Sequence, residues 1–446
     1  MICKRLILLA LALVVVIATG SSPADLDGTL RAALAGRGIT ELEPAPTISL
    51  AKVELGRSLF FDPILSGNRD VSCATCHHPT LHTSDGLPLS IGVGGSGLGR
   101  DRQLGEGRSF IPRNAPALFH LGDQSLSSMF WDGRVSRNAA GTFITPAGEV
   151  LPAGIDSILA AQAMFPVTSR DEMRGFPGDT DLTGRANEIA VFSDYDFEGI
   201  WNALWERLMN VDAYRERFEV AFPELTIEKM GFEYAANAIA AFEATAFTLT
   251  DSPWDRYLNG RDEALTEGAK RGALLFYGKA GCANCHMGSL MTDQTHHNVG
   301  VPPLGPGKLG GLIDSGRGLL TMNEGDRFAF RTPPLRNVAV TGPWMHNGAY
   351  QRLEDAVAHM LDPETALHRY DPQQLPAGLQ PTVRLEEAMI DTVLATLDPL
   401  LWTPVELSEP EFDDLMSFLA ALTSPSTVDL VRAIPDEVPS RLTVER

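Results

Sequence analysis

Apolar residues recur with helical spacing in several segments of this chain, whereas alternating strand patterns are scarce. Within residues 49–61, Leu55 and Leu59 fall on one helical face, and Pro63 follows where the pattern stops. Such a period with a proline at its end predicts an amphipathic helix. The same pattern predicts further helices over residues 200–222, 227–247, 266–277 and 407–422. The chain is therefore predicted to be mainly α-helical.

The helical plan occurs twice. A helix over 49–61 leads into C-A-T-C-H at 73–77, and a helix over 266–277 leads into C-A-N-C-H at 282–286. Later in each half, an Arg- and Pro-containing segment is followed by an aromatic-rich turn. Two copies of one unit indicate a duplication, and each unit looks like a cytochrome c domain.

C-x-x-C-H is the attachment signature of a c-type haem. The two thiols bond to porphyrin vinyl groups, and the adjacent histidine becomes an iron ligand. The alternatives are a redox dithiol, or zinc held as Cys₄ or Cys₂His₂ by both copies together. Zinc pairs need no histidine directly after the second cysteine, yet both copies have one. We therefore expect two covalently bound haem c groups, attached through Cys73, Cys76, His77, Cys282, Cys285 and His286.

The first twenty residues look like a secretory signal peptide. Lys4 and Arg5 precede an uninterrupted apolar run from Leu6 to Ala18, which small residues follow. The run is too short for a comfortable membrane span, and no later segment approaches one. The four cysteines beyond it all lie in the two C-x-x-C-H motifs, which leaves none for disulfides. We expect a soluble, periplasmic protein.

The formal net charge of −21 disfavours binding to nucleic acid or to anionic membranes. It suits either simple solubility or a negative face that steers a basic redox partner. The patterns divide the chain into a signal peptide (1–20), an N-terminal arm (21–45), two cytochrome c-like domains (46–250 and 251–425) and a C-terminal tail (426–446).

The paired C-x-x-C-H motifs, F-W-D-G-R at 130–134 and T-G-P-W-M-H-N-G at 341–348 together resemble the bacterial dihaem cytochrome c peroxidase and MauG superfamily. The resemblance covers roughly residues 46 to 422. It implies two packed cytochrome c-like domains, with a peroxidatic haem in the first and an electron-transfer haem in the second.

The resemblance assigns the sixth ligand of the second haem to Met360, where the peroxidases carry an axial methionine and MauG a tyrosine. His359 is an adjacent competitor for that role. A soft thioether favours reduced iron, which suits a haem that receives electrons.

In resting peroxidases, a loop histidine in a Ser-Ile-Gly-His-Gly setting caps the first haem. The corresponding run here, residues 90–94, carries Val93 at that position, which has no ligating atom. Unless His82 or His120 substitutes, we expect this iron to be five-coordinate and open, as peroxide chemistry requires.

Gln162 and Glu172 fall where the family has its distal glutamine and glutamate, which places Glu172 as acid/base for peroxide cleavage. The alternative is an acidic surface loop, since Asp171 and Asp179 are close in sequence. An insert over 135–155 is longer than in many relatives, and its effect on partner or substrate access is not readable from the sequence.

Trp131 resembles the family's tryptophan between the haems, and its alternative role is a packed aromatic side chain. Asn114, Thr341 and Pro343 match an inter-haem calcium site, and His346 is expected to support haem propionates or the inter-haem hydrogen-bond network. The pair His296-His297 is read either as a metal site or as solvated loop histidines.

The leading hypothesis is a periplasmic peroxidase that reduces hydrogen peroxide with electrons from a small c-type cytochrome or cupredoxin. The second is a MauG-type enzyme that uses peroxide and high-valent haems to oxidise a residue such as tryptophan on a partner protein. The third is a dihaem electron-transfer protein. A homodimer is compatible with all three, and the same scaffold hosts each activity.

Overall fold

The computed structural model describes residues 23–308, 311 and 313–446, so the expected signal peptide lies outside the described residues. Helices dominate and the strands have two or three residues each, which confirms a mainly α-helical chain. No described helix is long and apolar enough to cross a membrane. The helices are α1 (Pro23–Gly36), α2 (Leu50–Phe61), α3 (Cys73–Cys76), α4 (Ile158–Ala163), α5 (Phe197–Met209), α6 (Asp212–Ala221), α7 (Phe232–Ala246), α8 (Pro253–Leu258), α9 (Glu267–Tyr277), α10 (Gly318–Thr321), α11 (Leu353–Leu361), α12 (Pro363–His368), α13 (Glu387–Leu394) and α14 (Glu409–Ala421).

The strands form two small antiparallel sheets. Their bounds are β1 (Ser128–Met129), β2 (Val135–Arg137), β3 (Phe143–Ile144), β4 (His296–His297) and β5 (Phe330–Arg331). The first sheet has the order β1-β2-β3, and β4 pairs with β5. The β2–β3 hairpin lies within the 135–155 insert.

Each half of the chain is built on one pair of crossing helices, α2 with α7 and α9 with α14. A glycine lies at each crossing. A Cβ on Gly56 would lie 1.8 Å from the carbonyl oxygen of Ala238, and one on Gly272 would lie 1.9 Å from that of Asp414. Only glycine allows the two backbones to approach so closely. The same crossing is built twice, which supports the duplication seen in the sequence.

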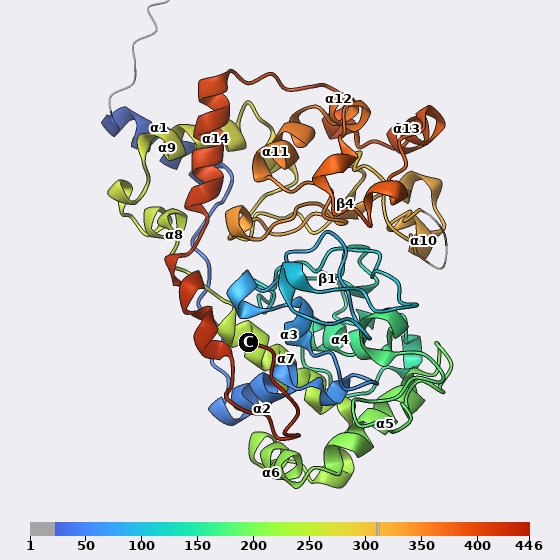
Figure 1. Cartoon of the computed structure of the whole chain (residues 1–446). Coiled ribbons are helices and arrows are strands. Elements are labelled where there is room, and N and C mark those ends of the chain that lie inside the picture. The colour runs from blue at the N-terminus through green and yellow to red at the C-terminus, as the bar shows by residue number, and fades with distance from the viewer. Residues whose placement is uncertain (1–22, 309–310, 312) are drawn as a thin grey trace, which may run out of the picture.

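Other features repeat in the same order. His120 and Asn337 both adopt left-handed backbone conformations, with φ of 61° and 63°. Their backbone N–H groups donate to the carbonyls of Phe247 and Leu422, just beyond α7 and α14 respectively. Figure 1 shows the two halves as two lobes, with α2 to α7 in the lower lobe and α9 to α14 mainly in the upper one.

The two terminal segments pack on the opposite halves. Helix α1 lies within the predicted arm and packs along α9, where Leu30 and Leu34 are buried (Figure 1). Beyond α14 the chain returns to the first half, where Val438 is buried in the core and the C-terminus lies near α2 and α7 (Figure 1). Both terminal segments are therefore packed. The N-terminal one contributes apolar side chains to the core of the second half, and the C-terminal one to the core of the first half.

The predicted helix over 200–222 is in fact two helices, α5 and α6. Asn210 ends α5 by donating its N–H to the carbonyl of Glu206, and α6 starts two residues later. The helix predicted over 227–247 begins only at Phe232, since the preceding Gly231 has an extended backbone. Helical periodicity identified the helical content here and missed these interruptions.

We expect Gly272→Ala to lower the free energy of unfolding by about 1–3 kcal/mol or more, because the new methyl group would overlap a backbone carbonyl that cannot move aside. Gly268, in the same helix, is the control, since its added Cβ would meet only side-chain atoms, the nearest of them on Asp414 at 3.0 Å. Gly268→Ala should be neutral or slightly stabilising. Urea unfolding midpoints measure both, and equal midpoints for the two variants would contradict the close crossing.

Candidate functional site

The two C-x-x-C-H segments fold alike, the first as α3 and the second as a short 3₁₀ turn. The Nδ1 atom of His77 lies 3.1 Å from the carbonyl oxygen of Thr83, and that of His286 lies 3.0 Å from the carbonyl oxygen of Met291. Both accepting residues have positive φ, of 63° and 59°. An N–H donated from Nδ1 to a carbonyl leaves Nε2 of each ring as a metal ligand. Both motifs therefore present a histidine in the tautomer that iron requires.

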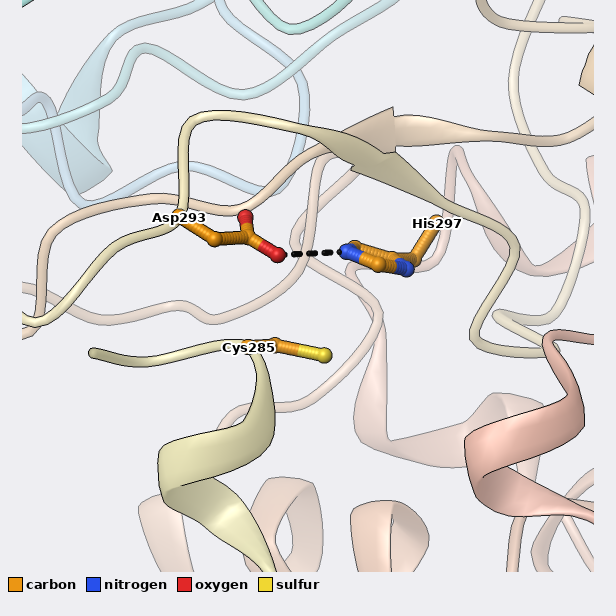
Figure 2. A group of neighbouring side chains, drawn as sticks. All are labelled: Cys285, Asp293 and His297. Carbon is orange, nitrogen blue, oxygen red and sulfur yellow. Dashed lines mark hydrogen bonds and ion pairs between the residues drawn. The ribbon is translucent and has the colours of Figure 1, made fainter.

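The structure argues against the two rival uses of these cysteines. Burial raises the pKa of Cys73 and of Cys282 to about 12, whereas a redox dithiol needs a thiolate. Among the described residues, the group of three or more potential metal-ligating side chains that comes together is Cys285, Asp293 and His297, so the two motifs do not combine into a Cys₄ or Cys₂His₂ site (Figure 2).

His297 is held between two carboxylates, and Figure 2 shows one of them, Asp293, facing its ring. Its Nε2 lies 2.9 Å from Asp293 and its Nδ1 lies 2.6 Å from Asp398. The hydrogen bond with Cys285, followed by those with Asp398 and Asp293, outweighs burial and raises the pKa of His297 to about 10. Both ring nitrogens are thus engaged by carboxylates. The interpretation as a solvated loop histidine is wrong, because His297 lies in β4 with its side chain 14% exposed.

Helix α11 carries the two adjacent candidates for the sixth ligand of the second haem iron, and the structure argues against His359. His359 is fully buried, with Nδ1 2.8 Å from the Tyr350 hydroxyl and Nε2 2.7 Å from the carbonyl oxygen of Val299. Its ligating atoms are therefore already used by the protein. Met360 follows it, is half-buried and remains the predicted ligand.

The loop over 90–94 packs directly on the turn that carries Glu172. A Cβ on Gly92 would lie 2.0 Å from the carbonyl oxygen of Asp171 and 2.5 Å from that of Glu172. The N–H of Val93 donates to the carbonyl of Asp171 at 3.2 Å, and Val93 itself is buried. The structure therefore brings together the loop without its histidine and the predicted acid/base. Gln162 is half-buried near the end of α4. A short 3₁₀ segment separates it from the turn that carries Glu172.

Glu172 lies among cations from both halves. Burial raises the pKa of its carboxyl, and Arg134 and Lys308 partly offset that rise. Lys308 belongs to the second half, and burial, followed by repulsion from Arg134 and Arg113, lowers its pKa to about 8. A carboxyl with a raised pKa can take up and release a proton nearer to neutral pH, as general acid–base catalysis needs.

A buried ion network joins the halves beside this site. Arg113 donates from Nη1 to Asp132 at 2.5 Å, and from Nε and Nη2 to Asp314 at 2.6 Å and 2.9 Å. Although burial opposes it, Arg134, Arg113 and Lys308 hold the pKa of Asp132 well below its usual range. The sequence analysis missed this network. Its one signal was that Arg113 and Asp132 lie inside the repeated motif segments.

The structure gathers three predicted residues where the halves meet. The indole N–H of Trp131 donates to the carbonyl of Asn114 at 2.9 Å, and the N–H of Arg331 donates to the carbonyl of Trp131 at 2.7 Å. The N–H of Asn114 in turn donates to the carbonyl of His346 at 2.8 Å. The His346 ring is buried, stacks on Phe330 with ring centroids 3.4 Å apart and lines a small pocket.

The residues predicted to bind calcium belong to two segments that meet in this region. The Nδ2 atom of Asn114 donates to the carbonyl of Leu87 at 2.8 Å, which leaves the side-chain oxygen as its ligating atom. Thr341 and Pro343 belong to the segment that contacts Asn114 through His346. Amide and backbone carbonyl oxygens are of the type that calcium binds.

Several buried polar atoms in the described residues have no partner, and one is a guanidinium N–H of Arg331 next to Trp131. Burial lowers the pKa of this arginine to about 10. A buried arginine donor without an acceptor fits an anionic group such as a haem propionate. With the two histidine tautomers, it shows that the residues present fit two haem groups.

The two substitute caps considered for the first iron, His82 and His120, each keep a buried ring nitrogen without a hydrogen-bond partner among the described residues, so their side chains stay candidates for that role. His82 directly precedes Thr83, whose carbonyl holds His77, so it belongs to the turn on the proximal side. His120 donates its N–H to the carbonyl of Phe247, and burial together with Arg336 lowers its side-chain pKa to about 3.

Glu243 is a buried carboxyl in α7 without a hydrogen-bond partner for Oε2, and it lies close enough to Cys73 to raise the pKa of that thiol. Glu243 directly follows Phe242, which contacts the glycine of the first helix crossing. At the second crossing the equivalent phenylalanine is Phe418, and the residue after it is Leu419, so the second half has an apolar side chain where the first has Glu243. Burial raises the pKa of Glu243 from 4.5 to about 8.

The folded protein therefore binds the extra proton, and its free energy of unfolding should fall as pH rises from about 4.5 to about 8, by up to about 1.4 kcal/mol per unit. Glu243→Leu should flatten this dependence in urea unfolding at pH 5 and pH 8. If the free energy of unfolding of Glu243→Leu depended on pH as strongly as that of the wild type, burial of Glu243 would not be the cause of the pH dependence.

The fold and these sites define a mainly helical redox protein with two haem-attachment sites. The family model for di-haem cytochrome c peroxidase matches residues 50–263. MauG, the methylamine utilization protein of Methylorubrum extorquens, is 33% identical over 70% of this chain and 68% of its own length. The cytochrome c551 peroxidase of Pseudomonas aeruginosa is 32% identical over 72% and 75%, respectively.

Among solved structures, a MauG-like protein associated with microbial copper homeostasis aligns with a TM-score of 0.58 and 25% identity, over 87% of this chain and 94% of that one. The chain belongs to the di-haem cytochrome c peroxidase family. It is a haem-dependent oxidoreductase, as the sequence analysis predicted.

Proposed function

We propose that the protein is a periplasmic di-haem c-type peroxidase that reduces hydrogen peroxide to water with electrons from a small c-type cytochrome or cupredoxin. The unit over 46–250 would hold one haem through Cys73, Cys76 and His77, and the unit over 251–425 the other through Cys282, Cys285, His286 and Met360. Bound haem would supply reversible one-electron transfer and, at His77, an iron that accepts peroxide. Export would rely on the segment over 1–20.

The observation that carries this proposal is the contact between the Val93 loop and the Glu172 turn. An apolar side chain stands where resting relatives carry a capping histidine, and a carboxyl with a raised pKa lies against the same loop. An electron carrier would need neither feature. Together they support an open reaction centre with a proton-transfer group in place.

Reduction of peroxide consumes two electrons and two protons and gives two waters. Glu172 would take the proton from the peroxide oxygen nearer the iron and deliver it to the farther oxygen, which leaves as water. Gln162 would orient the peroxide by hydrogen bonding. Lys308 and Arg134 would stabilise the carboxylate form between these two steps.

Electrons would enter at the second haem and pass by way of Trp131. Both the indole N–H and the carbonyl of Trp131 are hydrogen-bonded, which fixes it between the halves. The Arg113 network crosses the same boundary and would keep the distance between the haems constant. A calcium ion at Asn114, Thr341 and Pro343, with His346 supporting propionates, would stabilise this region further.

A second candidate is a MauG-type enzyme that oxidises a residue on a partner protein, because MauG proteins stand among the relatives and an open first haem suits both activities. Met360 favours the peroxidase, as MauG carries a tyrosine at that position. A homodimer is compatible with either. An electron-transfer protein is the third candidate, and cyanide binding to the oxidised first haem would exclude it.

The deciding experiment adds peroxide to the oxidised protein with either a reduced small cytochrome or a candidate partner protein. Rapid oxidation of the cytochrome with no change in partner mass is expected for the peroxidase. A long-lived spectral change at both haems, with an altered partner mass and no cytochrome oxidation, would instead support the MauG-type activity.

A further inference from the structure

The last residues of the chain form a strap on the first half. Arg57 of α2 donates from Nε to the carbonyl of Ala433 at 2.6 Å, and the Ser440 hydroxyl donates to Asp62, which ends α2, at 2.6 Å. We call residues 433–446 the C-terminal strap. Figure 1 shows the chain running from the end of α14 down to the lobe that contains α2, α3 and α7, where the strap lies.

The strap ends on the first haem-attachment segment. The Thr75 hydroxyl donates to the Glu445 carboxylate, and the Glu445 carbonyl oxygen lies 3.4 Å from Nε2 of His78. Thr75 is fully buried and lies between the two cysteines of α3. The corresponding residue of the second motif, Asn284, is exposed, so the second site has no such contact.

Glu445 also reaches the other side of the site through Arg102. The Arg102 side chain is 1% exposed and its Nη1 lies 3.6 Å from Glu445 Oε1. It donates to the carbonyl of Ile91 at 2.7 Å and to that of Gly92 at 2.9 Å. Gly92 packs against the backbone of Glu172. A continuous chain of contacts therefore joins the end of the strap to the predicted acid/base.

We propose that Glu445 is a positioning residue for the first haem site, which fixes the attachment helix α3 relative to the loop over 90–94. It touches neither peroxide nor iron, and acts through Thr75 and Arg102. The inference rests on the proposed function only in taking the first site as the reaction centre. A charged hydrogen-bond partner holds such groups more tightly than a neutral one, so removing the carboxylate loosens the loop.

The test compares Glu445→Ala with Glu437→Ala, a matched control in the exposed part of the strap. Hydrogen exchange of the amides over 90–96 should be at least about tenfold faster in Glu445→Ala and unchanged in the control. The absorption and electron paramagnetic resonance signals of the first haem should shift, while those of the second stay the same. Glu445→Asp should restore part of both effects.

If Glu445→Ala does not fold, Glu445→Gln keeps a partner for Thr75 and removes only the charge facing Arg102, and the same selective shift is expected. Unchanged loop exchange and first-haem spectra would overturn the inference, as would equal changes at both haems. Neither readout uses turnover, so a protein without peroxidase activity would refute the proposed function and leave this test valid.

Discussion

Glu172→Gln is expected to lower the turnover number for peroxide by about a hundred- to ten-thousand-fold, the usual contribution of a positioned acid–base group. Glutamine keeps the size and hydrogen bonding of the side chain but cannot carry a proton between the two peroxide oxygens. Because burial raises the pKa of Glu172, the wild-type turnover number should also change with pH at values above the usual carboxyl pKa range. The variant should lose this pH dependence. Stopped-flow reduction of peroxide across pH measures both effects.

Asp171→Asn is the matched control. Asp171 is adjacent and its pKa is also raised by burial, although Arg108 opposes that rise. Its carbonyl accepts the N–H of Val93, a contact that the substitution leaves in place. The control should keep nearly wild-type turnover. Equal losses in the two variants would mean that the acidic turn acts as a whole and that Glu172 has no special role.

Val93→His is expected to close the first site. A histidine here would restore the sequence that caps the iron in resting relatives, and it would convert the first haem of the oxidised protein to a low-spin, six-coordinate form. If the cap is favoured by about 1.4 kcal/mol, turnover without prior reduction falls about tenfold. Peroxide assays of the oxidised and half-reduced enzyme, with absorption spectra of each, measure the effect.

Val93→Leu controls for bulk, because leucine is larger than valine and has no ligating atom. Its first haem should stay high-spin, with some loss of stability from overpacking in this buried position. A high-spin, fully active Val93→His enzyme would show that the loop over 90–94 does not face the iron.

The sequence identified what local patterns encode. The cysteine and histidine spacing of both motifs and the apolar periodicity of α2, α9 and α14 are readable over fewer than fifteen residues, whereas the missing loop histidine was inferred from the resemblance to a family. Residue-level assignments such as Glu172 and Met360 came from the resemblance to a family. They stay predictions here, now with the contact between Gly92 and Glu172 and the full engagement of His359 in their support.

What the sequence did not reveal depends on contacts between distant residues. Arg113 and Asp314 are 201 positions apart, and Thr75 and Glu445 are 370 apart. Nothing in the local composition of residues 433–446 distinguishes a strap from a free tail, because its few apolar side chains gain meaning only against the first half. His297 was misread partly for the same reason, since Asp398 lies 101 positions away, although Asp293 is only four positions away.

The central claim is that the first haem is open in the oxidised protein, and the spin state of the purified diferric protein tests it most directly. Electron paramagnetic resonance and absorption spectra should show one high-spin, five-coordinate haem and one low-spin, six-coordinate haem, with peroxide turnover starting without prior reduction. Two low-spin, six-coordinate haems, with no turnover until the protein is half-reduced, would contradict it.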